Sequence, residues 1–147
     1  MKRTRRILFA TDFSPASRPA FRSALDLARS LKADLVLTHA LAPIGPLDGV
    51  YAPYVDWTPL EEATREAAQK SLERLAAATR KRGVRATTVL TSGSAAAEIV
   101  QTARARRVNL IVMGTHGRTG LTRLVMGSVA LRVMMTAPCP VMTLRGK

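Results

Sequence analysis

Glycine and hydroxyl residues in the second half of the chain have the types and the spacing that bind phosphate. The segment Met113 to Ser128 reads MGTHGRTGLTRLVMGS and carries glycines at Gly114, Gly117, Gly120 and Gly127. Glycines let the backbone bend tightly and approach an anion without a Cβ atom, and free amides at a helix start carry partial positive charge. The Ser128 hydroxyl adds a hydrogen-bond donor at the same point. The segment therefore predicts a phosphate cradle.

The spacing of this segment differs from the two familiar nucleotide loops, because no lysine precedes Ser128 as in a P-loop and the glycines do not read GxGxxG. It resembles the nucleotide motif of the universal stress protein family, which is GxxG, nine residues, then Gly followed by Ser or Thr. By composition, such a match arises by chance in roughly one chain in two hundred of this length. The resemblance continues in ILFATDFSPAS (first strand and acidic turn), THALAP (end of the second strand) and PVMTLR (closing strand).

The resemblance implies one domain over residues 1–147, with a five-stranded parallel sheet of the adenine nucleotide alpha hydrolase type. It further implies ATP, with Mg or Mn, over the strand ends, and two chains paired through their last strands. Asp12 corresponds to the acidic residue near the ribose and any nucleotide-bound metal, and Ala40 to a backbone contact for adenine. The implied nucleotide-binding residues are Ala10, Thr11, Asp12, Ala40, Met113, Gly114, His116, Gly117, Arg118, Gly127, Ser128 and Val129. Ala10 and Phe13 depart from the commoner residues beside Asp12.

Structural roles compete with these assignments at several residues. Gly114 is alternatively a simple turn, Asp12 a solvated carboxylate or a helix cap, and His116 a solvated loop histidine. His39 lies in an apolar strand, where a core or hydrogen-bonded histidine is favoured over a ligand. Cys139 lies between two prolines, so packing is favoured over a redox role. Two histidines and one cysteine this far apart do not form a metal site.

The site must be positioned by strands that alternate with helices. The apolar patterns predict strands over Arg6–Thr11, Asp34–Ala40, Val84–Leu90, Asn109–Met113 and Val141–Leu144. The Asn109–Met113 run is apolar without alternation, which indicates a strand covered on both faces. Strict alternation predicts an α/β fold, a doubly wound parallel sheet with helices on both faces and ligands outside the carboxyl ends of the strands.

Helix starts are predicted from N-cap patterns. Ser14-Pro15 opens a first helix whose inner face is predicted to be Ala20, Ala24, Leu27, Ala28 and Leu31. Thr58-Pro59-Leu60-Glu61 is a capping box that opens a helix ending at Arg82, before Gly83. Ser94 caps a helix to about Arg106, and a last helix runs from Ser128 to Met135. Residues 41–58 form a long loop, and the methionines are expected to fill the core and a subunit contact.

Charge and hydropathy limit the classes of protein to which this chain can belong. The 147 residues contain 23 Lys+Arg against 10 Asp+Glu, a net charge of +13, and 47% of them are hydrophobic. The hydrophobic content excludes intrinsic disorder, and the apolar runs are too short for a membrane span of about 20 residues. No signal peptide pattern follows the basic start. The expected location is the cytoplasm.

The C-terminal third is wholly basic, because no acidic residue follows Glu98. Such a field favours polyanions, whereas a solvated basic surface is the simpler interpretation. Three functions therefore compete: an ATP-binding stress-response regulator, a slow ATP hydrolase, and a charge-driven nucleic-acid-binding protein. The first is favoured, and Gly127→Val is expected to block phosphate without disturbing the fold.

The last strand, Val141-Met142-Thr143-Leu144, is expected at a sheet edge, since it ends the alternation. An open apolar edge favours pairing, here a homodimer, over a monomer shielded by Arg145 and Lys147. Met142→Pro is expected to remove a donor from this edge and shift the dimer toward monomer.

Overall fold

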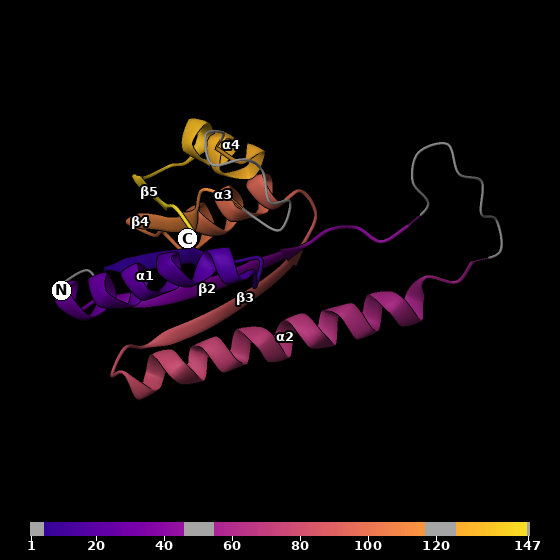
Figure 1. Ribbon diagram of the computed structural model, residues 1–147, viewed down its shortest axis with the longest axis horizontal. Coiled ribbons are helices and arrows are strands. Elements are labelled where there is room, and N and C mark those ends of the chain that lie inside the picture. The colour runs from indigo at the N-terminus through magenta and orange to yellow at the C-terminus, as the bar shows by residue number, and fades with distance from the viewer. Residues whose placement is uncertain (1–4, 46–54, 117–125, 147) are drawn as a thin grey trace.

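Five parallel strands form one sheet in the computed structural model, which describes residues 5–45, 55–116 and 126–146 (Figure 1). The strands are β1 (Arg6–Ala10), β2 (Asp34–Leu41), β3 (Ala86–Ser92), β4 (Leu110–Gly114) and β5 (Val141–Leu144). Their order is β3-β2-β1-β4-β5, and every neighbouring pair is parallel. The predicted doubly wound parallel sheet is confirmed, and β5 lies at an edge as expected.

Helices cover both faces of the sheet. One face packs against α1 (Arg18–Leu31) and α2 (Thr58–Lys81), and the other packs against α3 (Ala95–Ala105) and α4 (Ser128–Thr136). Figure 1 shows α3 and α4 together on the side of the sheet away from α2, whose first half projects beyond the strands. Within the described residues, no helix is both long and apolar enough to cross a lipid bilayer.

Two hydrophobic cores arise from the alternation of side chains along each strand. In β1, Ile7 and Phe9 belong to the core under α1 and α2, whereas Leu8 and Ala10 belong to the core under α3 and α4. These four side chains are at most 7% exposed. Successive strand residues point to opposite faces, so a central strand that is buried on both sides needs an unbroken apolar run.

The sheet contains one topological switch point. From β1 the chain proceeds outward to β2 and β3, and it then crosses back to add β4 and β5 on the other side of β1. The connections after β1 and β4 therefore leave in opposite directions, which opens a crevice at the carboxyl ends of these strands. Both predicted parts of the site, the acidic turn and the glycine-rich segment, follow these two strands.

The first helix begins later than predicted. Pro15–Ser17 forms a short 3-10 helix, η1, and α1 starts at Arg18. Ser14 makes no side-chain capping bond, and its amide donates a hydrogen bond to the Asp12 carboxylate at 2.9 Å. The inner face also differs, since Leu25 is buried and Leu31 is 42% exposed.

The predicted capping box at the start of α2 is wrong. Trp57 occupies the N-cap position and makes no side-chain capping bond, and Thr58 is already helical. The Asp56 carboxylate instead accepts a hydrogen bond from the Thr58 amide at 3.0 Å. The predicted C-terminal stop is observed, because Gly83 adopts φ 77° after the helix ends. Helix α3 begins after Ser94 as predicted, but that serine also makes no side-chain capping bond.

Other boundaries agree within two residues, and the largest strand shift is at β3, which starts at Ala86 rather than Val84. The centre of the 41–58 loop, residues 46–54, lies outside the described residues. Met113 fills the core, but Met134, Met135 and Met142 are 47%, 78% and 37% exposed. These three are therefore not core residues of the single chain, and their expected place in a subunit contact stays a prediction.

Candidate functional site

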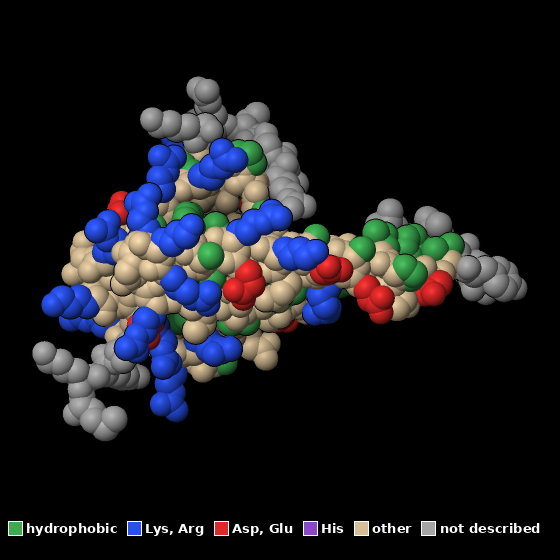
Figure 2. Space-filling model, turned by 90° about the horizontal axis from the view of Figure 1, so that it is seen from below, with side chains coloured by type: hydrophobic (Ala, Val, Ile, Leu, Met, Phe, Trp, Pro, Cys, Tyr) green, Lys and Arg blue, Asp and Glu red, His purple; other side chains and the backbone are tan. Residues whose placement is uncertain are grey.

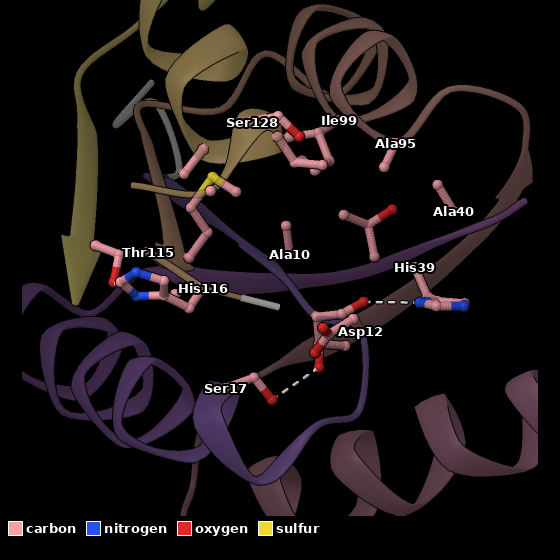
Figure 3. A pocket seen from close by; sticks show the side chains of 17 residues that line it. Ala10, Asp12, Ser17, His39, Ala40, Ala95, Ile99, Thr115, His116 and Ser128 are labelled. Atoms are coloured by element: carbon pink, nitrogen blue, oxygen red, sulfur yellow. Dashed lines mark hydrogen bonds between the residues drawn. The ribbon is translucent and has the colours of Figure 1, made fainter. Parts of the chain in front are cut away.

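A cavity of about 290 Å³ lies at the switch point, over the carboxyl ends of β1, β2 and β4 and the first turns of α3 and α4 (Figure 3). The structure brings ten of the twelve predicted site residues to its wall. They are Ala10, Thr11, Asp12, Ala40, Met113, Gly114, His116, Gly127, Ser128 and Val129. The other two, Gly117 and Arg118, lie outside the described residues. The nucleotide contacts assigned to all twelve remain predictions.

The turn after β1 is held by short-range hydrogen bonds. Thr11 Oγ1 accepts from the Phe13 amide at 2.9 Å and lies 3.3 Å from Ser17 Oγ, which donates to the Ser14 carbonyl at 2.7 Å. Phe13 has φ 62°, a left-handed conformation that bulky residues rarely adopt. Asp12 lines the cavity and also holds the turn through its bond from the Ser14 amide.

His39 forms part of the cavity wall, a role that sequence reasoning missed. Its Nδ1 lies 2.7 Å from the Thr11 carbonyl oxygen. Because a carbonyl oxygen only accepts, Nδ1 carries the proton and donates it. The ring packs against Phe13 with centroids 4.5 Å apart. The predicted hydrogen-bonded histidine is therefore observed, but it faces the cavity and links the ends of β1 and β2.

Apolar side chains line the end of the cavity near β2 and α3. Figure 3 shows Ala40 and Ala95 beside each other there, with Ala10 on the floor and Ile99 opposite Asp12. Ile99 is 6% exposed and Met113, further along the floor, is also 6% exposed. Flat apolar groups such as a nucleobase are stabilised in such a region by burial. Ala95 and Ile99 were missed because they belong to neither motif, and only the packing of α3 on the sheet brings them to the cavity.

The start of α4 forms the polar end of the cavity. Leu131 donates the first hydrogen bond of the helix, to the Gly127 carbonyl, at 3.1 Å. The amides of Ser128, Val129 and Ala130 therefore lack intrahelical acceptors, as in the first turn of any α-helix. All three residues line the cavity, so this end is suited to an anion.

Gly127 has a structural role besides its place in the motif. Its amide donates to the Thr115 carbonyl at 2.7 Å, and a Cβ atom at this residue would lie 2.9 Å from the same oxygen. The Gly127 amide is therefore already paired, and any side chain would collide with backbone. We therefore expect Gly127→Val to displace the first turn of α4 and to lower stability, contrary to the expectation that it leaves the fold undisturbed. Gly114 differs, because its Cβ would meet nothing closer than 3.4 Å.

His116 is half-buried at the cavity wall and is not a solvated loop histidine. Its Nδ1 lies 2.8 Å from Thr115 Oγ1. Its Nε2 is buried and has no hydrogen-bond partner among the described residues. An unpaired buried ring nitrogen is costly unless a ligand or water pairs with it. His116 thus supplies a polar atom that the described protein leaves unsatisfied.

The charges around the cavity are few. Asp12 is the one carboxylate on the described lining, which contains no lysine or arginine. Anion binding by these residues therefore depends on amides and hydroxyls. Among residues 5–45, 55–116 and 126–146, no three His, Cys, Asp or Glu side chains gather as a metal site.

Cys139 lies away from the cavity, packed against the core under α3 and α4. Burial raises the pKa of its thiol, and a backbone hydrogen bond with Ile111 only partly opposes this. Because the thiolate is the reactive form, we expect Ellman's reagent at pH 7 to react several times more slowly with the folded chain than with the chain in guanidinium. Equal rates would contradict the packing role.

Comparison with known proteins identifies relatives along nearly the whole chain. The family model of the universal stress protein family matches residues 3–145. Universal stress protein MJ0531 of Methanocaldococcus jannaschii is 33% identical over 141 residues, covering 96% of this chain and 82% of that protein. Universal stress protein YxiE of Bacillus subtilis is 32% identical over 145 residues, covering 95% and 98%.

Solved structures share the fold. Hypothetical protein MJ0577 superposes with a TM-score of 0.84 at 25% identity, covering 97% of this chain and 96% of that one. A universal stress protein from Archaeoglobus fulgidus, solved in complex with dAMP, superposes with a TM-score of 0.67 at 22% identity, covering 99% and 100%. Because the family model matches residues 3–145 and two relatives are more than 30% identical over most of their length, this chain belongs to the universal stress protein family.

Proposed function

We propose that the cavity at the switch point binds an adenine nucleotide, ATP in the first place, and that the chain is a cytoplasmic stress-response regulator. The observation that carries this proposal is the meeting of an apolar end, at Ala40 and Ala95, with the unpaired amides of α4 in one cavity. A nucleotide has the matching distribution, an apolar base at one end and phosphates at the other. The dAMP complex of a relative with the same fold supports the choice of adenine.

Each part of the nucleotide has residues to contact. The base would pack on Ala10, Ala40 and Ile99, and the Ala40 backbone would supply its polar contact. The phosphates would accept hydrogen bonds from the Ser128 hydroxyl and the first amides of α4. If Thr115 donates to His116 Nδ1, the proton resides on Nε2, which then donates to a phosphate oxygen. Arg118, inside the motif, would add positive charge.

Asp12 would contact the ribose or a metal carried by the nucleotide. Its carboxylate lies at the end of β1, facing the cavity. Carboxylates are preferred ligands of Mg²⁺, which binds proteins through one or two carboxylates and the phosphates of its nucleotide. Bound Mg²⁺ or Mn²⁺ would neutralise phosphate charge, which the described lining does not do.

Binding should be measured first by thermal stabilisation. ATP with Mg²⁺ is expected to raise the melting temperature of the wild-type chain, since a ligand that binds only the folded state stabilises it. Ser128→Ala removes one hydroxyl donor at an exposed position and is expected to weaken binding by about tenfold, from the loss of roughly 1.5 kcal/mol for a hydrogen bond to a charged group. Thr136→Ala, at the other end of α4, is the matched control. An unchanged affinity in Ser128→Ala would remove this end of α4 from the site.

Hydrolysis is the second candidate, because Asp12 and His116 both line the cavity and either side chain can accept a proton. Single-turnover assays with Asp12→Ala and His116→Gln test it. Bound but unhydrolysed ATP favours the regulator. ATP hydrolysis that falls in either variant without a matching loss of affinity favours the hydrolase.

The nucleic-acid alternative is weaker. Figure 2 shows Lys and Arg side chains spread over the visible face rather than gathered in one stripe, with Asp and Glu on the projecting part of α2. Charge-driven binding would fall steeply with salt and would not depend on ATP.

We further propose a homodimer through β5, formed by Val141, Met142, Thr143 and Leu144. The amides of Ile111 in β4 and of Thr115, which follows β4, donate to the carbonyls of Pro140 and Leu144. Alternation along a strand then directs the backbone groups of Val141 and Thr143 to the open edge. The exposed methionines Met134 and Met135 of α4 and Met142 of β5 are candidates for burial by the second copy.

A further inference from the structure

A second cavity, of about 270 Å³, lies between α1 and α2 on the opposite face of the sheet from α4. Its apolar wall consists of aromatic and aliphatic side chains. Phe9 and Phe21 pack with ring centroids 5.4 Å apart, and Phe13 and Leu75 complete the wall. The volume is just below the range of about 300–1,000 Å³ typical of small-molecule sites. The cavity thus suits a small ligand with an apolar body.

Two arginines are the only charged residues that the structure places on this cavity. Arg18 begins α1 and Arg74 lies in the fifth turn of α2, so two separate helices bring an arginine to the lining of one cavity. Both are exposed, and neither makes an ion pair within the described residues. No acidic side chain lies on the described lining. This end of the cavity is therefore positively charged and favours an anion, most strongly a carboxylate or another planar oxyanion.

A polar group without a partner lies in the same wall. Ser14 is 9% exposed, and its Oγ is buried with no hydrogen-bond partner among the described residues. It lines the second cavity and not the first. A buried hydroxyl without a partner costs stability. A ligand oxygen would satisfy it.

The conformation of Phe13 gives an independent indication. A left-handed φ of 62° costs a phenylalanine free energy, and such strain is found more often at functional sites. The Phe13 ring contacts the His39 ring and also lines the second cavity. The strained residue thus forms part of the apolar surface that a ligand would touch.

We propose that this second cavity binds a small carboxylic acid with an apolar aliphatic or aromatic body. The body packs on Phe13, Phe21 and Leu75, and the carboxylate lies at the opening, between Arg18 and Arg74. The Ser14 hydroxyl donates to a ligand oxygen. The proposal is independent of nucleotide binding, since it depends on a different cavity.

Calorimetric titration of the full chain with octanoate tests the proposal. We expect a dissociation constant of about 1 mM or lower, and no binding of octylamine, which has the same chain and the opposite charge. Arg18→Gln together with Arg74→Gln should weaken octanoate at least about tenfold. Arg22→Gln, an exposed arginine of α1 outside the cavity, is the control and should leave affinity unchanged.

A cavity-filling variant tests the position of the ligand. Ser71 lines the cavity from α2, and its hydroxyl donates a hydrogen bond to the Ala67 carbonyl of its own helix. Ser71→Leu keeps a good helix former and should abolish octanoate binding without lowering the melting temperature, whereas Ala67→Leu should have no effect. Three results would overturn the proposal: no binding of octanoate, equal binding to Ser71→Leu and to wild type, or competitive displacement of octanoate by ATP. ATP binding is measured separately, so its failure would leave this result intact.

Discussion

A Gly127→Ala variant is expected to melt several degrees below the wild-type chain and to bind ATP more weakly. The new Cβ atom would lie 2.9 Å from the Thr115 carbonyl oxygen, a backbone atom that cannot rotate away. Overpacking of this kind costs about 1–3 kcal/mol, and a domain of this size loses roughly 4 °C per kcal/mol. Relief of the collision must move the first turn of α4, where the phosphates are proposed to bind. Differential scanning fluorimetry with and without ATP measures both effects.

Gly114→Ala is the matched control for stability, because its Cβ would make only ordinary contacts, the nearest at 3.4 Å. Its melting temperature without ligand should stay close to that of wild type. If Gly127→Ala proves as stable as Gly114→Ala, the close approach between α4 and Thr115 is not a structural constraint. If Gly127→Ala is destabilised yet keeps the full ATP-induced shift, the phosphates do not depend on this turn.

Thr143→Pro is expected to convert the proposed dimer to a monomer while the chain stays folded. The Thr143 amide faces the open edge, so proline removes a donor to the second copy without breaking the bonds between β4 and β5. Light scattering at micromolar concentration should then give the mass of one chain. A dimer that persists in Thr143→Pro would place the interface elsewhere, and a monomeric wild type would refute the dimer.

The expectation that Met142→Pro removes a donor from the open edge is wrong, and this variant serves instead as the contrast to Thr143→Pro. Met142 pairs with Val112, and its amide faces β4 rather than the edge. Proline there would break the internal ladder and is expected to lower the melting temperature more than Thr143→Pro does. The sequence alone could not separate the two variants, because the direction of each amide depends on the register between β4 and β5.

Strand content and the position of the cavity could be predicted from the sequence, since buried parallel strands require continuous apolar runs and the switch point follows from their order. The exact starts of the helices could not be predicted in this way. At both Ser14 and Thr58 an aspartate two residues earlier accepts the backbone amide, and this local bond competes with the predicted capping pattern. At Thr58 this bond takes the amide that Glu61 would accept in a capping box, and at Ser14 a 3-10 turn over Pro15–Ser17 precedes α1.

Side chains that join the cavity from separate elements were also beyond sequence reasoning. The sequence correctly predicts a hydrogen-bonded His39, but its acceptor is the carbonyl of Thr11, directly after β1, and only the pairing of β1 with β2 brings the two together. The second cavity combines residues from β1, α1 and α2, which have no common motif. Such sites depend on packing between elements, and no spacing along the chain encodes them.

Thr11 and Ser17 line both cavities, so one layer of side chains separates the two proposed ligands. This shared wall is a route by which one ligand could change the affinity for the other. Any such coupling is reciprocal: if the acid changes the affinity for the nucleotide by some factor, the nucleotide changes the affinity for the acid by the same factor. The concentrations of two metabolites would then be combined at one turn of the chain. The amount of nucleotide bound would then depend on the concentration of the acid as well as on that of the nucleotide.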